Sequence, residues 1–287
     1  KTSATKTENQ AFERIPRSTV AEVYTAVIND LQAAAAKLPE DNGTRANRYT
    51  ALAYLARVYL QQGDYVHALD AANQVIESGR YAMNASVRAV FDNRNSAESI
   101  WEIQQNDQNN AGTSNNGMAT FYASLPGIGR ADVRMSLNFL DSYDPNDLRL
   151  NEWYYVGTGA RPGNYYCSKW KSYSQNLPVI RIAEMYLIRA ECNVRLNSVV
   201  GDTPENDLAQ VRNPIRTNLP VIPNPTLSDI LNERFHELAF EGFRIHDIRR
   251  LHLSFSDYNW DDDILVFPIP QAEVDATGGV IVQNPGY

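Results

Sequence analysis

The sequence predicts a mainly α-helical protein in which helix hairpins support a loop-rich, aromatic-rich insertion that contains short strands. Three observations lead to this fold class. Apolar residues recur with the period of a helix over residues 18–38, 46–78 and 181–196. A Gly-Asp pair at 63–64 divides the second of these stretches, as a turn between two helices would. Finally, residues 101–173, which are 73 of the 287, hold 7 of the 16 Tyr and 3 of the 4 Trp.

The first half of the chain is expected to form a helix followed by a helix hairpin. Ser18 is predicted to cap the first helix, which ends before Pro39. In the hairpin, Ala56 is expected to face Ala68 and Ala72, because small side chains let two helices approach closely. The spacing of large and small residues is typical of the tetratricopeptide repeat, whose units must stack to bury their faces. We therefore expect further hairpins.

The rest of the chain is predicted to contain strands, loops and a second, weaker hairpin. Residues 98–104 alternate as a short strand does, and residues 104–117 are a polar loop of Asn, Gln, Ser and Gly. The second hairpin is predicted to pair a helix over 181–196 with one over 207–217. A charged helix is expected after Thr226, with its charges continuing to Arg250.

Composition excludes two classes of protein. The 26 basic and 34 acidic residues give a net charge of -8, so no overall positive field attracts nucleic acid. No run approaches the roughly 20 apolar residues that cross a bilayer. The two cysteines, Cys167 and Cys192, allow either one bridge or two free thiols.

A zinc protease motif is incomplete. His236-Glu237 is followed by His246 at the outer spacing of such a motif, but Phe240 stands where the second imidazole would complete the ligand set. We interpret the two histidines as residues of a polar helix face and predict no metal and no cofactor.

Other polar motifs are interpreted as structural. Gly157–Gly163 is expected to be a turn rather than a dinucleotide loop, and Asp261–Asp263 a solvated turn rather than a calcium site. The acidic ladder of Glu233, Glu237 and Glu241 predicts an ion-pair network that needs basic partners, for which Arg234, Arg244 and Arg249 are nearest in sequence. No serine hydrolase or P-loop signature is present, so we expect a binding protein rather than an enzyme.

The aromatic region suits carbohydrate. Trp and Tyr offer flat faces that stack on sugar rings, while amides and charged groups can bind hydroxyl groups. We expect Trp101 and Trp170 to be structural. The candidate ligand-binding residues are Phe121, Tyr122, Asn151, Trp153, Tyr154, Tyr155 and Tyr165.

Motifs spread along nearly the whole chain resemble the SusD/RagB family. They include Arg14-Ile-Pro-Arg-Ser-Thr, the hairpin around Gly63, and Arg181-x-Ala-Glu-Met-Tyr-Leu. The most specific are Glu233-Arg-x-x-Glu-Leu-x-Phe-Glu-Gly-x-Arg244, Phe267-Pro-Ile-Pro270 and Gln283-Asn-Pro-Gly-Tyr287. All are scaffold motifs, so the resemblance assigns no binding residue.

The resemblance implies a lipid-anchored protein on the extracellular face of the outer membrane. Such a protein binds glycan and delivers it to a SusC-like TonB-dependent transporter, and its fold has four tetratricopeptide-like hairpins. A peptide-binding RagB-type importer component and a tetratricopeptide protein-interaction scaffold remain alternatives.

The resemblance also implies one SusD-like domain over residues 1–287 that lacks its N-terminal segment. Its parts are expected to be a helical region over 18–80, a ligand-face insertion over 98–175, a helical region over 181–251 and a docked C-terminal loop region over 252–287.

Overall fold

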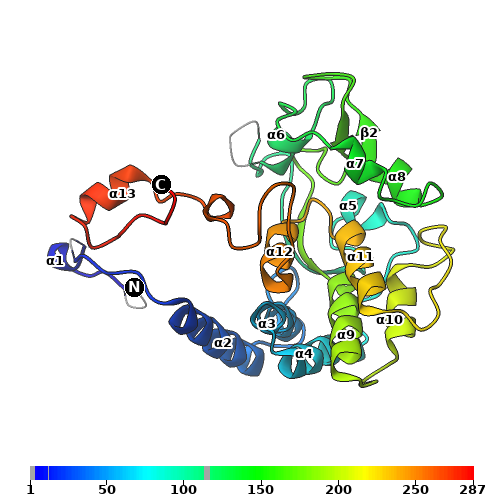
Figure 1. Ribbon diagram of the computed structural model, residues 1–287, viewed down its shortest axis with the longest axis horizontal. Helices are drawn as coiled ribbons and strands as arrows, with labels where there is room; N and C mark the ends of the chain where they lie inside the picture. The colour runs from blue at the N-terminus through cyan, green and yellow to red at the C-terminus, as the bar shows by residue number, and fades with distance from the viewer. Residues whose placement is uncertain (1–3, 12, 113–116) are drawn as a thin grey trace. The chain divides into compact units, whose positions relative to one another are not determined.

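The structure, a computed structural model, describes residues 4–11, 13–112 and 117–287. It divides into two compact units, one of Ile28–Arg244 and one that combines Lys1–Val27 with Ile245–Tyr287 (Figure 1). The single domain over residues 1–287 stays a prediction.

The helical elements are α1 (Glu8–Ala11), α2 (Val20–Lys37), α3 (Arg48–Gln62), α4 (Tyr65–Glu77), α5 (Ala89–Asp92), α6 (Met118–Tyr122), α7 (Leu137–Leu140), α8 (Leu148–Glu152), α9 (Ile182–Leu196), α10 (Pro204–Val211), α11 (Leu227–Glu237), α12 (Arg244–Leu251), the 3-10 turn η1 (Asp263–Leu265) and α13 (Gln271–Ala276). The strands are β1 (Ser99–Ile103), β2 (Tyr154–Val156), β3 (Tyr165–Cys167) and β4 (Leu177–Arg181).

The first predicted hairpin is confirmed as α3 and α4. Asn47 caps α3 through the backbone N–H of Thr50, and Asp64 caps α4 through that of His67. Gly63 ends α3 in the left-handed conformation, with a φ of 76°, where a residue with a Cβ would be strained. Ala56 and Ala68 are fully buried, as expected for closely packed helices.

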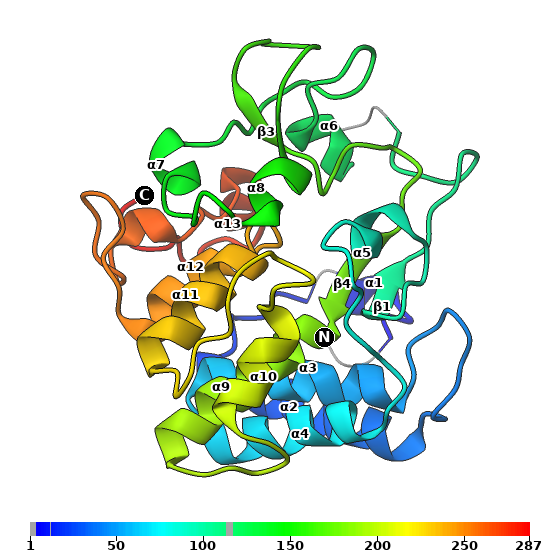
Figure 2. The same cartoon turned by 90° about the vertical axis from the view of Figure 1, so that its right-hand side faces the viewer.

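The long helix α9 lies at the centre of the larger unit. One side packs with α3 and α4 through Met185 and Ile188, and the other packs with α10 and α11 through Leu187 and Ala190. Figure 1 shows α9 between α4 and α10, and Figure 2 looks at α9 from the side of α10 and α11. The second predicted hairpin is thus present as α9 and α10, but α10 ends at Val211 rather than at 217, because Arg212 is extended and Pro214 follows.

The charged helix expected from Thr226 to Arg250 is broken in two. α11 ends at Glu237 and α12 starts at Arg244. Between them Phe240 and Gly242 have positive φ values of 63° and 87°, which no α-helix accommodates. The charged residues keep the helical spacing through this non-helical segment, so their spacing alone could not predict the break.

The first helix also starts one residue later than predicted. α2 begins at Val20, and Thr19 rather than Ser18 precedes it. The Thr19 hydroxyl accepts from the backbone N–H of Glu22, whose carboxylate in turn accepts from the Thr19 N–H at 2.8 Å, a reciprocal capping box.

Two short antiparallel sheets complete the larger unit. β1 pairs with β4, which confirms the strand predicted at 98–104, and β2 pairs with β3. The register of β1 shifts on both sides of Trp101. Gly157–Gly163 connects β2 to β3 as the predicted turn.

In the unit that contains both ends of the chain, hydrogen bonds join two of the motifs that carry the family resemblance. The Gln283 side chain donates to the carbonyl of Ile269 and accepts from its N–H, both at 2.7 Å. Asn284 donates to the carbonyl of Phe267, and Tyr287 to that of Val266, both at 2.8 Å. The Pro-Ile-Pro segment and the C-terminal motif therefore form one hydrogen-bonded structure. Among the described residues, no helix combines the length and apolarity that crossing a bilayer requires.

Candidate functional site

An open pocket of about 550 Å³ lies on the larger unit. It brings together the residue before α5, the segment after α6, and residues from α8, β2 and the segment after β3. Its lining contains three of the predicted ligand-binding residues and six others, in full Arg88, Leu125, Asn151, Glu152, Tyr154, Tyr155, Ser168, Lys171 and Ser172. The volume is within the range of about 300–1,000 Å³ that is usual for small-molecule sites.

Trp153 anchors the segment that carries the predicted residues. Its side chain is 0% exposed, and its indole N–H donates to the carbonyl of Val87 at 2.8 Å. Tyr154 is buried beside it, and its hydroxyl lies 2.6 Å from that of Tyr143. A fully buried ring has no free face for a sugar, so the prediction that Trp153 stacks on a ligand disagrees with its position in the core. Tyr154 borders the pocket but is only 4% exposed, so its ring is held in the core rather than offered for stacking.

Tyr155 is the aromatic residue of the triplet that remains partly exposed. Successive side chains of a strand point to opposite faces, so burial of Tyr154 turns Tyr155 the other way. Its hydroxyl accepts from the backbone N–H of Ser124 at 2.8 Å, and partial burial raises its pKa. Tyr155 therefore lines the pocket with a ring held at its polar end.

Two glycines let the turn after β2 pack against the segment that supplies Leu125. A Cβ on Gly159 would lie 2.2 Å from the carbonyl oxygen of Leu125, and one on Gly157 would lie 2.4 Å from the Ser124 hydroxyl. In this close arrangement, the N–H groups of Thr158 and Gly159 both donate to the carbonyl of Ser124. The glycines thus join the two segments at the edge of the pocket.

The two cations of the pocket differ in how far they are already paired. Arg88 bonds to Asp92 through Nε and Nη2, and its Nη1 donates to the Glu152 carbonyl at 2.8 Å and the Ser168 hydroxyl at 2.7 Å. The ammonium of Lys171 lies 3.9 Å from Asp92 and makes no hydrogen bond to the described chain. Burial and the charge of Arg88 lower the pKa of Lys171. Lys171 is therefore the cation with donors to offer a ligand.

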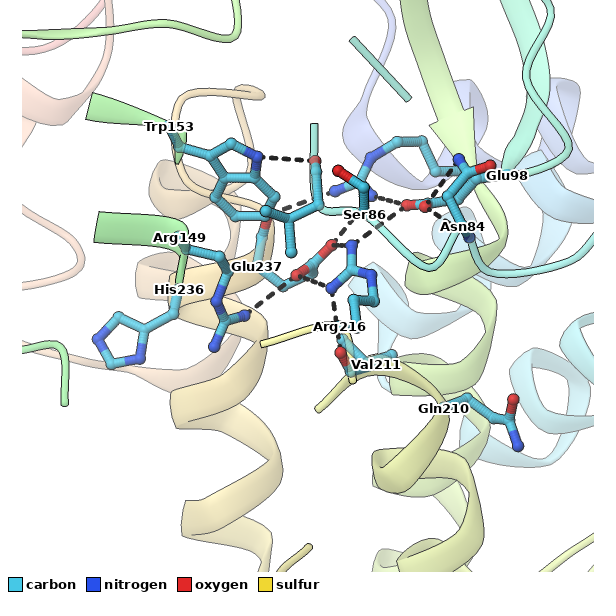
Figure 3. A network of polar contacts seen from close by, with 12 residues as sticks. Asn84, Ser86, Glu98, Arg149, Trp153, Gln210, Val211, Arg216, His236 and Glu237 are labelled. Carbon is cyan, nitrogen blue, oxygen red and sulfur yellow. Dashed lines mark hydrogen bonds and ion pairs between the residues drawn. The ribbon is translucent and has the colours of Figure 1, made fainter. Parts of the chain in front are cut away.

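The same unit contains a buried ion-pair network centred on Glu237. Figure 3 shows Arg149 and Arg216 reaching its carboxylate from different sides. Glu237 is 3.0 Å from Arg149, 3.1 Å from Arg181 and 2.7 Å from Arg216. Burial alone would raise the pKa of Glu237, but attraction to Arg216, Arg181 and Arg149 outweighs it and holds the pKa well below its usual range.

The network confirms the predicted structural role of the acidic ladder, but its partners are remote in sequence rather than the neighbouring arginines that were predicted; Arg234, for example, pairs with Glu184 at 3.8 Å. Glu233 pairs with Arg149, and Glu241 pairs with Lys169 at 2.7 Å. Arg149 and Lys169 each lie two residues before a part of the pocket wall, Asn151 and Lys171 respectively. The buried charges thereby fix both walls of the pocket.

The remaining predicted residues lie outside the pocket lining. Phe121 and Tyr122 belong to α6; the guanidinium of Arg130 lies 5.0 Å above the Phe121 ring, and Tyr122 packs edge-on against Phe240. Tyr165 is 39% exposed at the start of β3. Trp170 is buried and donates to the carbonyl of Phe240 at 2.9 Å, so it is structural as expected. Trp101 is only partly buried against the core.

His236 does not lie on a polar helix face as predicted. It is buried, its ring lies 4.1 Å from that of Tyr143, and its Nε2 is 3.0 Å from the Ser142 hydroxyl. Burial and the charge of Arg149 lower its pKa to about 4. His246 belongs to the separate helix α12. Within residues 4–11, 13–112 and 117–287, no group of three or more His, Cys, Asp or Glu is placed to hold a metal ion.

Sequence reasoning missed most of the polar lining. Arg88, Glu152, Lys171 and Ser172 come from segments up to 84 positions apart, and only the fold brings them together. The sequence offered one signal, the Lys-Trp-Lys run at 169–171. In the structure Lys169 and Trp170 are buried, whereas Lys171 is accessible in the pocket.

Comparison with known proteins agrees with this architecture. A model of the SusD family matches residues 145–264, and a model described as "Starch-binding associating with outer membrane" matches residues 1–60. SusD-like protein P2 of Formosa agariphila is 26% identical to the chain over 98% of its length and 67% of the relative's.

Two solved structures from Bacteroides vulgatus are similar. One is a putative sugar binding protein, 27% identical, with a TM-score of 0.81 over 96% of this chain and 67% of that one. The other is a SusD superfamily protein, 28% identical, with a TM-score of 0.80 over 96% and 68%. The chain spans about two thirds of the length of these relatives. By its motifs, the two family models and its fold, the chain belongs to the SusD/RagB family.

Proposed function

We propose that the chain is a non-enzymatic glycan-binding protein whose ligand occupies the pocket of Tyr155. The observation that carries this proposal is that one pocket of suitable size collects Asn151 and Tyr155 from the predicted set. Tyr155 would stack on a sugar ring, and the amide of Asn151 and the ammonium of Lys171 would bind hydroxyl oxygens. Each contact is weak, so affinity depends on several acting together.

Family membership supports a glycan ligand. The model that matches residues 1–60 is described by starch binding, and one of the similar structures is a putative sugar binding protein. In our proposal the protein lies at the extracellular face of the outer membrane, held by a lipid anchor. It delivers an oligosaccharide to a SusC-like TonB-dependent transporter.

Affinity gel electrophoresis with a panel of neutral polysaccharides tests the site. We expect at least one polysaccharide to retard the protein and Tyr155→Ala to lose most of that retardation, because a stacking contact contributes about 1 kcal/mol or more. Tyr165→Ala is the matched control, since Tyr165 is exposed on the neighbouring strand but does not line the pocket. Equal retardation of both variants would contradict the assignment.

The peptide alternative has its own support in the pocket, where the carboxylate of Glu152 and the ammonium of Lys171 offer charges of both signs. Calorimetric titration with a mixture of short peptides separates the two ligands. Binding of peptides that Tyr155→Ala weakens, with no response to any glycan, would replace the glycan proposal by peptide import. Release of sugars from a glycan by the purified protein would contradict the non-enzymatic assignment.

A further inference from the structure

A second, smaller cavity lies beside β1, in the larger unit and outside the pocket of Tyr155. Its volume is about 150 Å³. The two cavities share no lining residue. Its wall is formed by the connection between α2 and α3, the residues just after α4, and β1 itself. A cavity of this size is below the usual range for extended ligands but has room for one compact polar molecule.

Two polar side chains of this wall have atoms without partners. Glu102 is 3% exposed; its Oε2 accepts from the N–H of Asn95 at 2.9 Å and from the amide of Asn176 at 2.7 Å. Its Oε1 is buried and has no hydrogen-bond partner in the described chain. The hydroxyl of Ser99, 9% exposed, is likewise buried and unpartnered there. Buried acceptors of this kind are costly unless a bound group donates to them.

The irregular register of β1 explains why both residues line one cavity. Ser99 and Glu102 are three positions apart and would point to opposite faces of a regular strand. The pairing with β4 shifts on each side of Trp101, so the strand is bulged between them. Bulges commonly turn a side chain toward a site.

The other lining groups match a neutral polyhydroxylated molecule rather than an ion. The charges of the lining balance, because Asp41 and Arg80 form an ion pair at 3.3 Å and the other two charged residues, Glu102 and Arg45, are of opposite sign. Arg45 adds donors, and Trp101 adds an aromatic ring. Donors, acceptors and an aromatic face around a compact space are the groups that recognise a pyranose.

We propose that this cavity is a second carbohydrate subsite that takes a single neutral sugar unit. Hydroxyl groups of the sugar donate to Glu102 Oε1 and the Ser99 hydroxyl, and Trp101 contacts the ring. The subsite is independent of the pocket of Tyr155, so a glycan can be held at two separate positions.

Titration of tryptophan fluorescence and saturation-transfer NMR with glucose, galactose, mannose and xylose test the subsite. We expect saturable binding of at least one of them with a dissociation constant on the order of 1–10 mM, since the ligand has only about a dozen heavy atoms. Ser99→Ala breaks no hydrogen bond within the described chain and should fold normally, yet weaken binding at least fivefold. Asp41→Ala, which changes an exposed residue of the wall, should also weaken it.

Tyr155→Ala separates this proposal from the proposed function. Tyr155→Ala should reduce polysaccharide retardation and leave monosaccharide binding unchanged. Ser99→Ala should weaken monosaccharide binding and leave polysaccharide retardation unchanged. Three results overturn the subsite. These are no saturable response of the wild-type protein, wild-type affinity in both Ser99→Ala and Asp41→Ala, and loss of monosaccharide binding in Tyr155→Ala.

Discussion

Two lysines separated by a single tryptophan have opposite surroundings. Lys169 is fully buried and donates to the carbonyls of Glu237 and Ala239 at 2.9 Å and to the carboxylate of Glu241 at 2.7 Å. The side chain of Lys171 is 41% exposed in the pocket, and its ammonium makes no hydrogen bond to the described chain. Number of partners, rather than residue type, thus separates a structural cation from one free to bind.

The buried side of this comparison should show the largest effect on stability. Glu237→Gln leaves Arg149, Arg181 and Arg216 around a neutral group, so we expect the free energy of unfolding to fall by about 3–5 kcal/mol. Urea denaturation measures the loss. Asp70→Asn, at an exposed position of α4, is the control and should change stability very little. A stable Glu237→Gln variant would show that the network is dispensable.

Replacement of Trp153 tests whether the predicted aromatic triplet is divided between core and pocket. Trp153→Ala removes a fully buried ring and an indole hydrogen bond, so we expect a destabilisation of about 3–5 kcal/mol. Tyr155→Ala should be much milder in stability and more severe in binding. Thermal unfolding together with gel retardation measures both, and the opposite pattern would return Trp153 to the ligand site.

Acid should weaken the fold through His236. Its folded-state pKa of about 4 lies below the ordinary value, so the contribution of the neutral ring to stability is present above about pH 6.5 and is lost as pH falls through about 4. The shift corresponds to about 3 kcal/mol. Urea denaturation between about pH 7 and 4 should show a shallower decline for His236→Gln than for the wild type. Parallel curves would show that the imidazole has an ordinary pKa.

The accessible side of the comparison should affect binding alone. Lys171→Met keeps the length of the side chain but removes its donors, so we expect glycan affinity to fall about threefold to tenfold, the effect of one hydrogen bond. Thermal unfolding should be unchanged, because the only ion pair lost within the described residues is the 3.9 Å contact with Asp92. Titration calorimetry measures the affinity. Wild-type affinity would place Lys171 outside the ligand contacts.

Thiol labelling gives the smallest expected change. Cys167 and Cys192 are buried thiols, and burial raises the pKa of Cys167 to about 12. We expect no labelling of Cys167 by a thiol reagent at about pH 8 in the native protein and full labelling in denaturant. Rapid native labelling would reveal local opening around β3.

Local rules predicted the helices well and the site only in part. Asn47, Gly63 and Asp64 act within one turn of chain, so the bounds of α3 and α4 followed from neighbouring residues. The break at Phe240 and Gly242 did not, because the charge period runs through it. In the fold, Arg181 pairs with Glu237 before the break and with Glu241 inside it.

From the residue pattern alone came the mainly α-helical fold, the first hairpin, the strand at β1, the family resemblance and an aromatic region that includes Tyr155. Tertiary contacts decided which members of that region are buried. They also paired Glu237 with Arg149, 88 positions away, and Glu184 with Arg57, 127 positions away. Caps and helical period act over a few residues, whereas burial and charge pairing depend on groups that meet only in the folded chain.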